Sequence, residues 1–253
     1  MTVTEAICTG NARYQANQKL NPVGVVLHSI GCPQPDARVL RKYWQNNPYV
    51  THYVLDDVRI LHTMPNDRKC WHVGTPGNAK WLGIEMCEPK EIQYCTGTTF
   101  TVKDRAAARA YCEKTWQNAV WLLAKLCQEY GWNPETAILT HNEITRKGLS
   151  KTDHVDPEHL WRGLGLDYNL HKLRAAVKAA MPSREPAKSP DAPWLGRVTA
   201  SVLNVRNGPG MDCAIVQNVR RNEVYTIVDE QDGWGKLKSG AGWVSLRYIK
   251  PIG

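Results

Sequence analysis

Three features are missing from this chain of 253 residues, and each absence argues against one class of protein. No stretch comes near the roughly 18 consecutive apolar residues of a membrane-spanning helix, so we expect no membrane partner. None of the eight cysteines forms a CxxC pair, which argues against a zinc ribbon or a thioredoxin-type redox site. The first residues lack a basic start followed by an apolar run, so no secretory signal is predicted.

What is present is a basic, globular composition. Lys and Arg number 32 against 24 Asp and Glu, which gives a formal net charge of +8. A basic balance suggests an anionic partner. Because the basic residues are scattered rather than gathered into one tract, we expect that partner not to be nucleic acid. With no secretory signal, the cysteines are expected to be reduced and to serve as small apolar residues.

A change of composition divides the chain. The stretch MPSREPAKSPDAPW, residues 181–194, contains four prolines and almost nothing apolar. Segments of this kind remain extended, because they cannot bury enough surface to fold. We therefore predict a first domain over residues 1–180, a Pro-rich linker over 181–196 and a second domain over 197–253.

The first domain alternates between strand and helix patterns. Apolar runs predict strands at Val23–His28, twice within Thr51–Met64, at Trp81–Pro89 and at Ala137–Ile144, and helical patterns cover Pro35–Asn47, Asp104–Gly131 and Tyr168–Met181. This interleaving predicts an α/β fold with a mixed central sheet flanked by helices. The second domain has about five short Val/Ile/Thr/Tyr-rich runs split by Gly-containing turns, which predicts a small all-β barrel.

Candidate metal ligands lie at the ends of two apolar strands. His28 ends one such run and His141 follows another, while His154, Asp156 and His159 share a polar loop that Pro157 stiffens. Two histidines and an aspartate are an adequate three-ligand site for a zinc hydrolase, with one coordination position left for water. From the residues alone, each histidine has a second possible role, as a hydrogen-bonded residue of the core without a metal.

The motifs VVLHSIG, THYVLDD, KCWHVGTPGNAKWLGIEMCEP and LTHNEI...KTDHVDP, in this order, resemble the type-2 zinc-dependent N-acetylmuramoyl-L-alanine amidases. That family includes phage endolysins, recycling amidases and peptidoglycan recognition proteins. The resemblance implies hydrolysis of the amide between N-acetylmuramic acid and L-alanine in bacterial peptidoglycan. It implies Zn²⁺ held by His28, His141 and Asp156, with Glu85 of the GIE pattern as the catalytic acid/base.

The sequence departs from the commonest family pattern near the third ligand. His154 stands where many relatives have Lys, and we expect it to donate to the tetrahedral oxyanion. The run Lys151-Thr152-Asp153 also resembles the family's motif and would make Asp153 the ligand, although only Asp156 is followed by proline. Thr51 replaces a tyrosine that some members have, which leaves Glu85 as the expected base.

The role of two further histidines is not decided by the sequence. His52 and His72 are expected either to shape the cleft or to serve only structure.

The second domain is similar to bacterial SH3-type cell-wall domains, through LNVRNGPG and the pair Trp234 and Trp243. Its expected role is to tether the enzyme to an insoluble wall. Trp234, Trp243 and Tyr248 are either ligand-binding or core residues, and for Trp243 we expect the core.

The main hypothesis is a monomeric phage or prophage endolysin that stays in the cytoplasm until release and then acts on the wall. Two alternatives remain: a non-catalytic peptidoglycan receptor, and a zinc peptidase that cuts another stem-peptide bond.

Overall fold

The computed structural model describes residues 1–150, 152–181, 192–211 and 213–252. The chain separates into two compact units, Met1–Ala180 and Met181–Gly253, and each is described by itself. Most of the expected linker, residues 182–191, lies outside the described residues.

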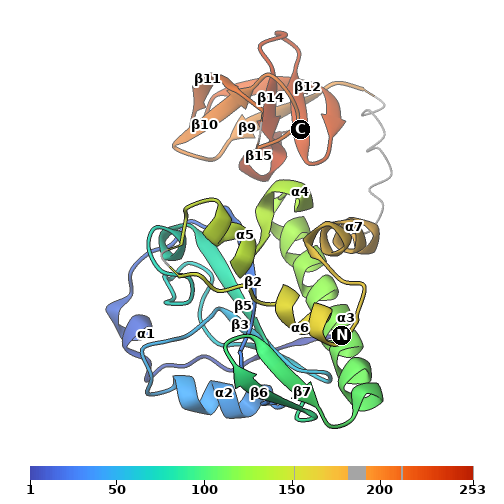
Figure 1. Ribbon diagram of the computed structural model, residues 1–253. Helices are drawn as coiled ribbons and strands as arrows, with labels where there is room; N and C mark the ends of the chain where they lie inside the picture. The colour runs from blue at the N-terminus through green and yellow to red at the C-terminus, as the bar shows by residue number, and fades with distance from the viewer. Residues whose placement is uncertain (151, 182–191, 212, 253) are drawn as a thin grey trace. The chain divides into compact units, whose positions relative to one another are not determined.

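A six-stranded mixed sheet forms the centre of the first unit (Figure 1). The order of its strands is β1-β4-β3-β5-β2-β8. Its strands are β1 (Val3–Glu5), β2 (Gly24–Ser29), β3 (Tyr53–Leu55), β4 (Ile60–His62), β5 (Trp81–Met86) and β8 (Ile138–Thr140). The strand β2 pairs in parallel with β5 and β8, whereas β3 and β4 pair with each other in antiparallel orientation. The expected α/β fold with a mixed central sheet is confirmed.

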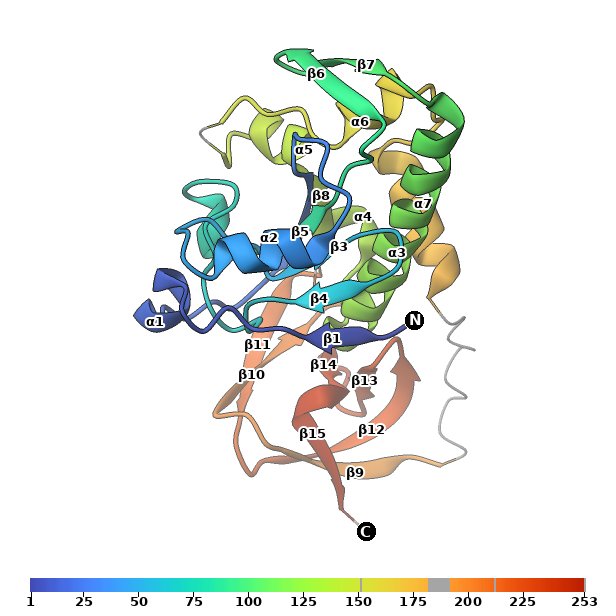
Figure 2. The same cartoon turned by 90° about the horizontal axis from the view of Figure 1, so that it is seen from below.

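Helices cover this sheet. The longest, α3 (Arg105–Tyr130), begins where the Asp104 side chain accepts from the Ala107 amide and ends at Gly131, which has a φ of 66°. Figure 2 shows α3 together with α7 (Leu170–Ala180) on the side of the sheet away from α2 (Ala37–Trp44). The unit also contains α1 (Ala12–Ala16), η1 (Gly77–Ala79), α4 (Pro134–Ala137), α5 (His141–Arg146), α6 (Glu158–Gly163) and the hairpin of β6 (Ile92–Thr96) and β7 (Thr99–Val102).

Two local expectations are wrong. The run Ala137–Ile144 is not one strand, because β8 ends at Thr140 and α5 begins at His141. The Thr140 side chain accepts from the amide of Glu143, and this Thr-x-x-Glu arrangement is typical of a helix start. His159 lies in α6 rather than in a loop.

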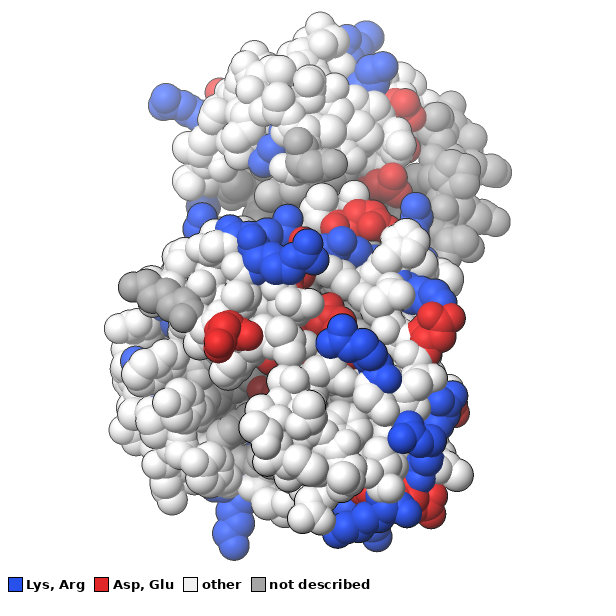
Figure 3. Space-filling view, viewed as in Figure 1, with Lys and Arg blue, Asp and Glu red and all other residues white. Residues whose placement is uncertain are grey.

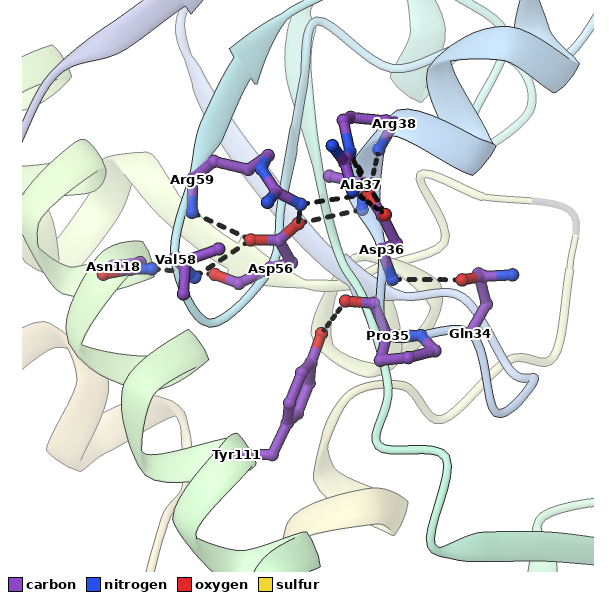
Figure 4. A network of polar contacts seen from close by, with 10 residues as sticks. All are labelled: Gln34, Pro35, Asp36, Ala37, Arg38, Asp56, Val58, Arg59, Tyr111 and Asn118. Carbon is purple, nitrogen blue, oxygen red and sulfur yellow. Dashed lines mark hydrogen bonds and ion pairs between the residues drawn. The ribbon is translucent and has the colours of Figure 1, made fainter.

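A polar network fixes the start of α2, which forms one wall of the cleft described below (Figure 4). The fully buried Asp56 carboxylate accepts from the amides of Ala37, Val58 and Arg59, and it pairs with the Arg59 guanidinium at 2.6 Å. From α3, the Asn118 side chain donates to the Asp56 carbonyl oxygen. The network therefore joins α2 to the β3–β4 turn and to α3.

We expect Asp56→Ala to lower the free energy of unfolding of the first unit by about 3 kcal/mol, because three backbone amides lose their acceptor and Arg59 loses the nearer of its two carboxylate partners. Urea denaturation followed by tryptophan fluorescence measures this change. The neighbouring Asp57→Ala is the matched control, with an expected loss below about 0.5 kcal/mol. Equal losses in the two variants would contradict the account of the network.

The second unit is a seven-stranded sheet in the order β11-β10-β14-β13-β12-β9-β15, with the short helix η2 (Leu246–Tyr248). Its strands are β9 (Trp194–Val198), β10 (Val202–Arg206), β11 (Ile215–Arg220), β12 (Val224–Gln231), β13 (Trp234–Leu237), β14 (Trp243–Ser245) and β15 (Ile249–Ile252). The expected all-β architecture is confirmed.

The tryptophans of this unit differ from expectation. Trp234 is the buried one, whereas Trp243 is only half-buried and Tyr248 is exposed. Each strand places alternate side chains on opposite faces. Trp243 and Val244 are consecutive in β14, and it is Val244 that enters the core.

Among the described residues, no helix is long and apolar enough to cross a membrane. All eight cysteines are free thiols. Five of them, Cys8, Cys70, Cys87, Cys112 and Cys127, are buried, as expected of small apolar residues.

Candidate metal centre and active-site cleft

Three side chains from separate parts of the chain converge at the end of the central strands. His28 is in β2, His141 begins α5, and Asp156 lies just before α6. The two Nδ1 atoms are 3.0 Å apart, and the Asp156 oxygens lie 3.3 Å from Nδ1 of His28 and 3.2 Å from Nδ1 of His141. All three residues are buried. Among the described residues, these three side chains form the one cluster of His, Cys, Asp or Glu whose ligand atoms lie close enough together to hold a metal ion.

These distances fit a zinc ion. Zinc bonds nitrogen and carboxylate oxygen at about 2.0–2.2 Å, so two ligands of a tetrahedral site lie about 3.3 Å apart. The three separations between donor atoms are all close to that value. Three protein ligands leave a fourth position for water or substrate, which is the pattern of catalytic rather than structural zinc.

A chain of hydrogen bonds sets the tautomer of His28. His72 Nε2 lies 3.2 Å from the Trp81 carbonyl oxygen, which only accepts, so His72 donates there and its Nδ1 is an acceptor. His28 Nε2 lies 2.9 Å from that Nδ1 and must therefore donate to it. The lone pair of His28 is left on Nδ1, which faces His141 and Asp156.

The other two ligands are oriented in the same way. His141 Nε2 lies 2.6 Å from the Thr152 hydroxyl oxygen, a contact that holds the ring with Nδ1 facing Asp156. The Ser29 amide donates to Asp156 Oδ2 at 3.2 Å. Such outer contacts fix ligand geometry before a metal arrives.

The protonation states suit metal binding. Burial lowers the pKa of His28, so its ring is neutral near pH 7. Burial alone would raise the pKa of Asp156, but the neighbouring His141 and His28 rings outweigh this and hold the pKa far below its usual value. Neutral imidazoles and an ionised carboxylate are the forms that coordinate a cation.

The ring of His72 rests on Gly83 of β5. A Cβ atom at Gly83 would lie 2.7 Å from the His72 ring, closer than such contacts allow. Glycine is therefore required at this position for the ring to reach His28.

We expect His72→Ala to weaken zinc binding about 10- to 100-fold, because His28 loses the acceptor that fixes its tautomer. Competition with a chromophoric chelator measures the affinity. The exposed His171 of α7 supplies the control, His171→Ala, with an expected affinity equal to that of the unaltered chain. Unchanged affinity in His72→Ala would refute the positioning role.

Glu85 lies beside His28 in the sheet. The two residues are register partners in the parallel β2–β5 pair, so their side chains leave the same face. Burial, with the negative charges of Asp156 and Glu88, raises the pKa of Glu85 well above its usual value. A carboxyl group of raised pKa beside a metal site is suited to accept and then donate a proton.

A cleft of about 620 Å³ opens over these groups. Besides the three candidate ligands and Glu85, it is lined by His154, Thr51 and aromatic side chains that include Tyr43, Tyr49 and Trp71. Tyr43, Tyr49 and Trp71 are exposed. These aromatic residues are not recognisable from the sequence, because no spacing marks them as members of one surface.

The remaining sequence candidates occupy different places. His154 is 59% exposed, and its Nδ1 lies 3.8 Å from Asp156 Oδ1. Asp153 is exposed and is not part of the three-residue cluster. His52 is buried, accepts from the Gly83 amide, and lies 2.8 Å from the Arg68 carbonyl, to which it donates. Burial lowers the pKa of His52 to about 3, which is consistent with a structural residue.

Two family models match parts of this chain. Residues 18–159 match the family model described as N-acetylmuramoyl-L-alanine amidase, and residues 201–250 match the bacterial SH3 domain. A bifunctional autolysin of Staphylococcus aureus is 23% identical over 202 residues, which are 72% of this chain and 15% of that protein. The chain thus spans a small part of that relative.

Solved structures share the fold of the first unit. The Staphylococcus aureus hydrolase AmiA, solved with its ligand, has a TM-score of 0.54 at 21% identity and covers 72% of this chain and 83% of its own. The structure of PlyL has a TM-score of 0.52 at 20% identity, over 71% of this chain and 99% of its own. Since the amidase model matches more than half of the sequence, the chain belongs to the N-acetylmuramoyl-L-alanine amidase family.

Proposed function

We propose that the first unit is a zinc-dependent hydrolase that cleaves the amide between N-acetylmuramic acid and L-alanine in bacterial peptidoglycan. The convergence of His28, His141 and Asp156 at 3.0–3.3 Å is the observation that carries the proposal. The family membership supports the choice of bond. The position of Asp156 among the buried histidines favours it over the exposed Asp153 as the third ligand.

When bound, zinc supplies Lewis-acid polarisation of the scissile carbonyl and acidifies the attacking water. Glu85 takes the proton of that water and passes it to the departing amine of alanine. Its position beside His28 on one face of the sheet supports this role. Its raised pKa makes the return of the proton favourable near neutral pH.

His154 is proposed to donate a hydrogen bond to the oxyanion of the tetrahedral intermediate. Its ring lies 4.6 Å from that of His141, measured between centroids, at the rim of the cleft. An exposed imidazole keeps an N–H available in both of its protonation states. Removal of such a donor costs about 100- to 1,000-fold in kcat in other hydrolases.

The second unit is proposed to hold the enzyme on the wall. Its match to a bacterial SH3 domain supports this role. A linked binding unit raises the effective concentration of the catalytic unit at an insoluble substrate.

Product analysis tests the proposed reaction. Purified walls digested with the protein are expected to show new N-terminal alanine and no new reducing sugar ends. New termini of other amino acids would identify a peptidase instead. Wall binding without any new termini would identify a non-catalytic receptor.

A further inference from the structure

A second hollow of about 300 Å³ adjoins the active-site cleft. The residue common to both is Trp71, so we name this feature the Trp71 hollow. Its wall includes Arg13 and Gln18 near α1, Lys69, and Thr75 and Asn78 near η1. A polymer bound in the cleft and passing Trp71 would enter this hollow.

The lining of the Trp71 hollow is rich in donors and has no acidic side chain. Two cations, Arg13 and Lys69, line it, and neither forms an ion pair with any acidic group in the described ranges. The Arg13 Nε atom is buried and has no hydrogen-bond partner among the described residues, so the protein does not compensate this donor from within.

Neighbouring groups hold these donors in place. The Arg13 guanidinium lies 4.0 Å from the centre of the Trp71 ring, a cation–π contact that orients it. The Asn78 Oδ1 atom accepts from the amides of His72 and Val73. That arrangement leaves the NH₂ group of Asn78 as the free donor of its side chain.

We propose that the Trp71 hollow binds an anionic group of the wall polymer, a carboxylate or a phosphate, while the scissile amide lies in the cleft. The inference rests on the proposed function, because only a polymeric wall substrate would span both features. A guanidinium, an ammonium and an amide NH₂ on one wall suit anionic oxygens, which accept several hydrogen bonds at once.

The net positive charge of the chain does not by itself select this place. On the face shown in Figure 3, Lys and Arg form several separate groups with Asp and Glu between them. What distinguishes the Trp71 hollow is two unpaired cations in a concave site that shares a residue with the cleft.

The test compares two double variants of equal charge in the full chain. Arg13→Gln/Lys69→Gln is expected to raise KM for purified walls about 10-fold and to leave kcat unchanged, since the contacts are remote from the reacting amide. The control, Lys114→Gln/Lys178→Gln, removes two exposed lysines of α3 and α7 and is expected to keep the original KM. Equal KM values for the two double variants would overturn the proposal.

Altered walls distinguish the two anions. If the ligand is a phosphate, the 10-fold difference disappears on walls stripped of phosphate polymers. If it is a carboxylate, the difference remains there and disappears on walls whose carboxyl groups are amidated. A difference that survives both treatments would overturn the proposal. Failure of the unaltered chain to release alanine would instead refute the proposed function.

Discussion

Replacing His141 with alanine is expected to remove zinc from the protein and to lower the rate of wall hydrolysis at least about 1,000-fold. Two ligands, His28 and Asp156, would remain, and the buried Asp156 carboxylate would lose one of its two buried imidazole partners. Lewis-acid stabilisation of the transition state is worth several kcal/mol, and about 4 kcal/mol corresponds to this rate factor.

Zinc per chain by mass spectrometry and alanine release are measured on the same sample. The control is again His171→Ala, a substitution on an exposed face of α7 that is expected to retain both zinc and rate. Thermal unfolding shows whether His141→Ala still folds. A folded variant that keeps stoichiometric zinc and half of the original rate would remove His141 from the ligand set.

Replacing Glu85 with glutamine is expected to lower kcat about 100- to 10,000-fold while zinc stays bound. Glutamine has nearly the same shape as glutamate but cannot accept the proton of the attacking water, and proton transfer contributes a factor of this size. Because His28, His141 and Asp156 are untouched, metal content should not change.

Glu113→Gln on the exposed surface of α3 is the matched control, with unchanged kcat expected. Steady-state kinetics on purified walls separates kcat from KM. A Glu85→Gln variant with near-normal kcat would show that another group moves the proton. Loss of zinc in that variant would show that Glu85 serves the metal site rather than the reaction.

The sequence located the candidate ligands because strand ends are recognisable. His28 ends an apolar run, and His141 follows another, so parallel pairing of the two strands with each other brings both residues to one edge of the sheet. Asp156 was inferred from the family motif and its proline. The structure places it against both histidines.

The groups that orient the ligands were beyond sequence reasoning. His72 is 44 residues from His28, and its contact depends on how its ring rests on Gly83, which no periodicity reveals. Thr152 lies in the run that suggested Asp153 as a ligand, yet it is the threonine that contacts His141. Tertiary packing, rather than local pattern, decides these roles.

Local patterns also failed where two signals compete. The expected strand continues past Thr140 to Ile144, but His141, Asn142 and Glu143 are polar, and the Thr140 and Glu143 pair favours a helix start. In the second unit, Trp234 and Trp243 each follow a glycine and look alike in sequence. Because side chains alternate along a strand, Val244 faces the core and Trp243 does not. No signal in the sequence decides which of the two residues faces inward.

The most direct test of the account is a titration of metal-free protein with zinc while N-terminal alanine release from purified walls is measured. We predict no release without metal, and a rate that rises linearly and levels off at about one zinc per chain. Full alanine release by the metal-free protein, or none at any zinc concentration, would contradict the zinc amidase assignment.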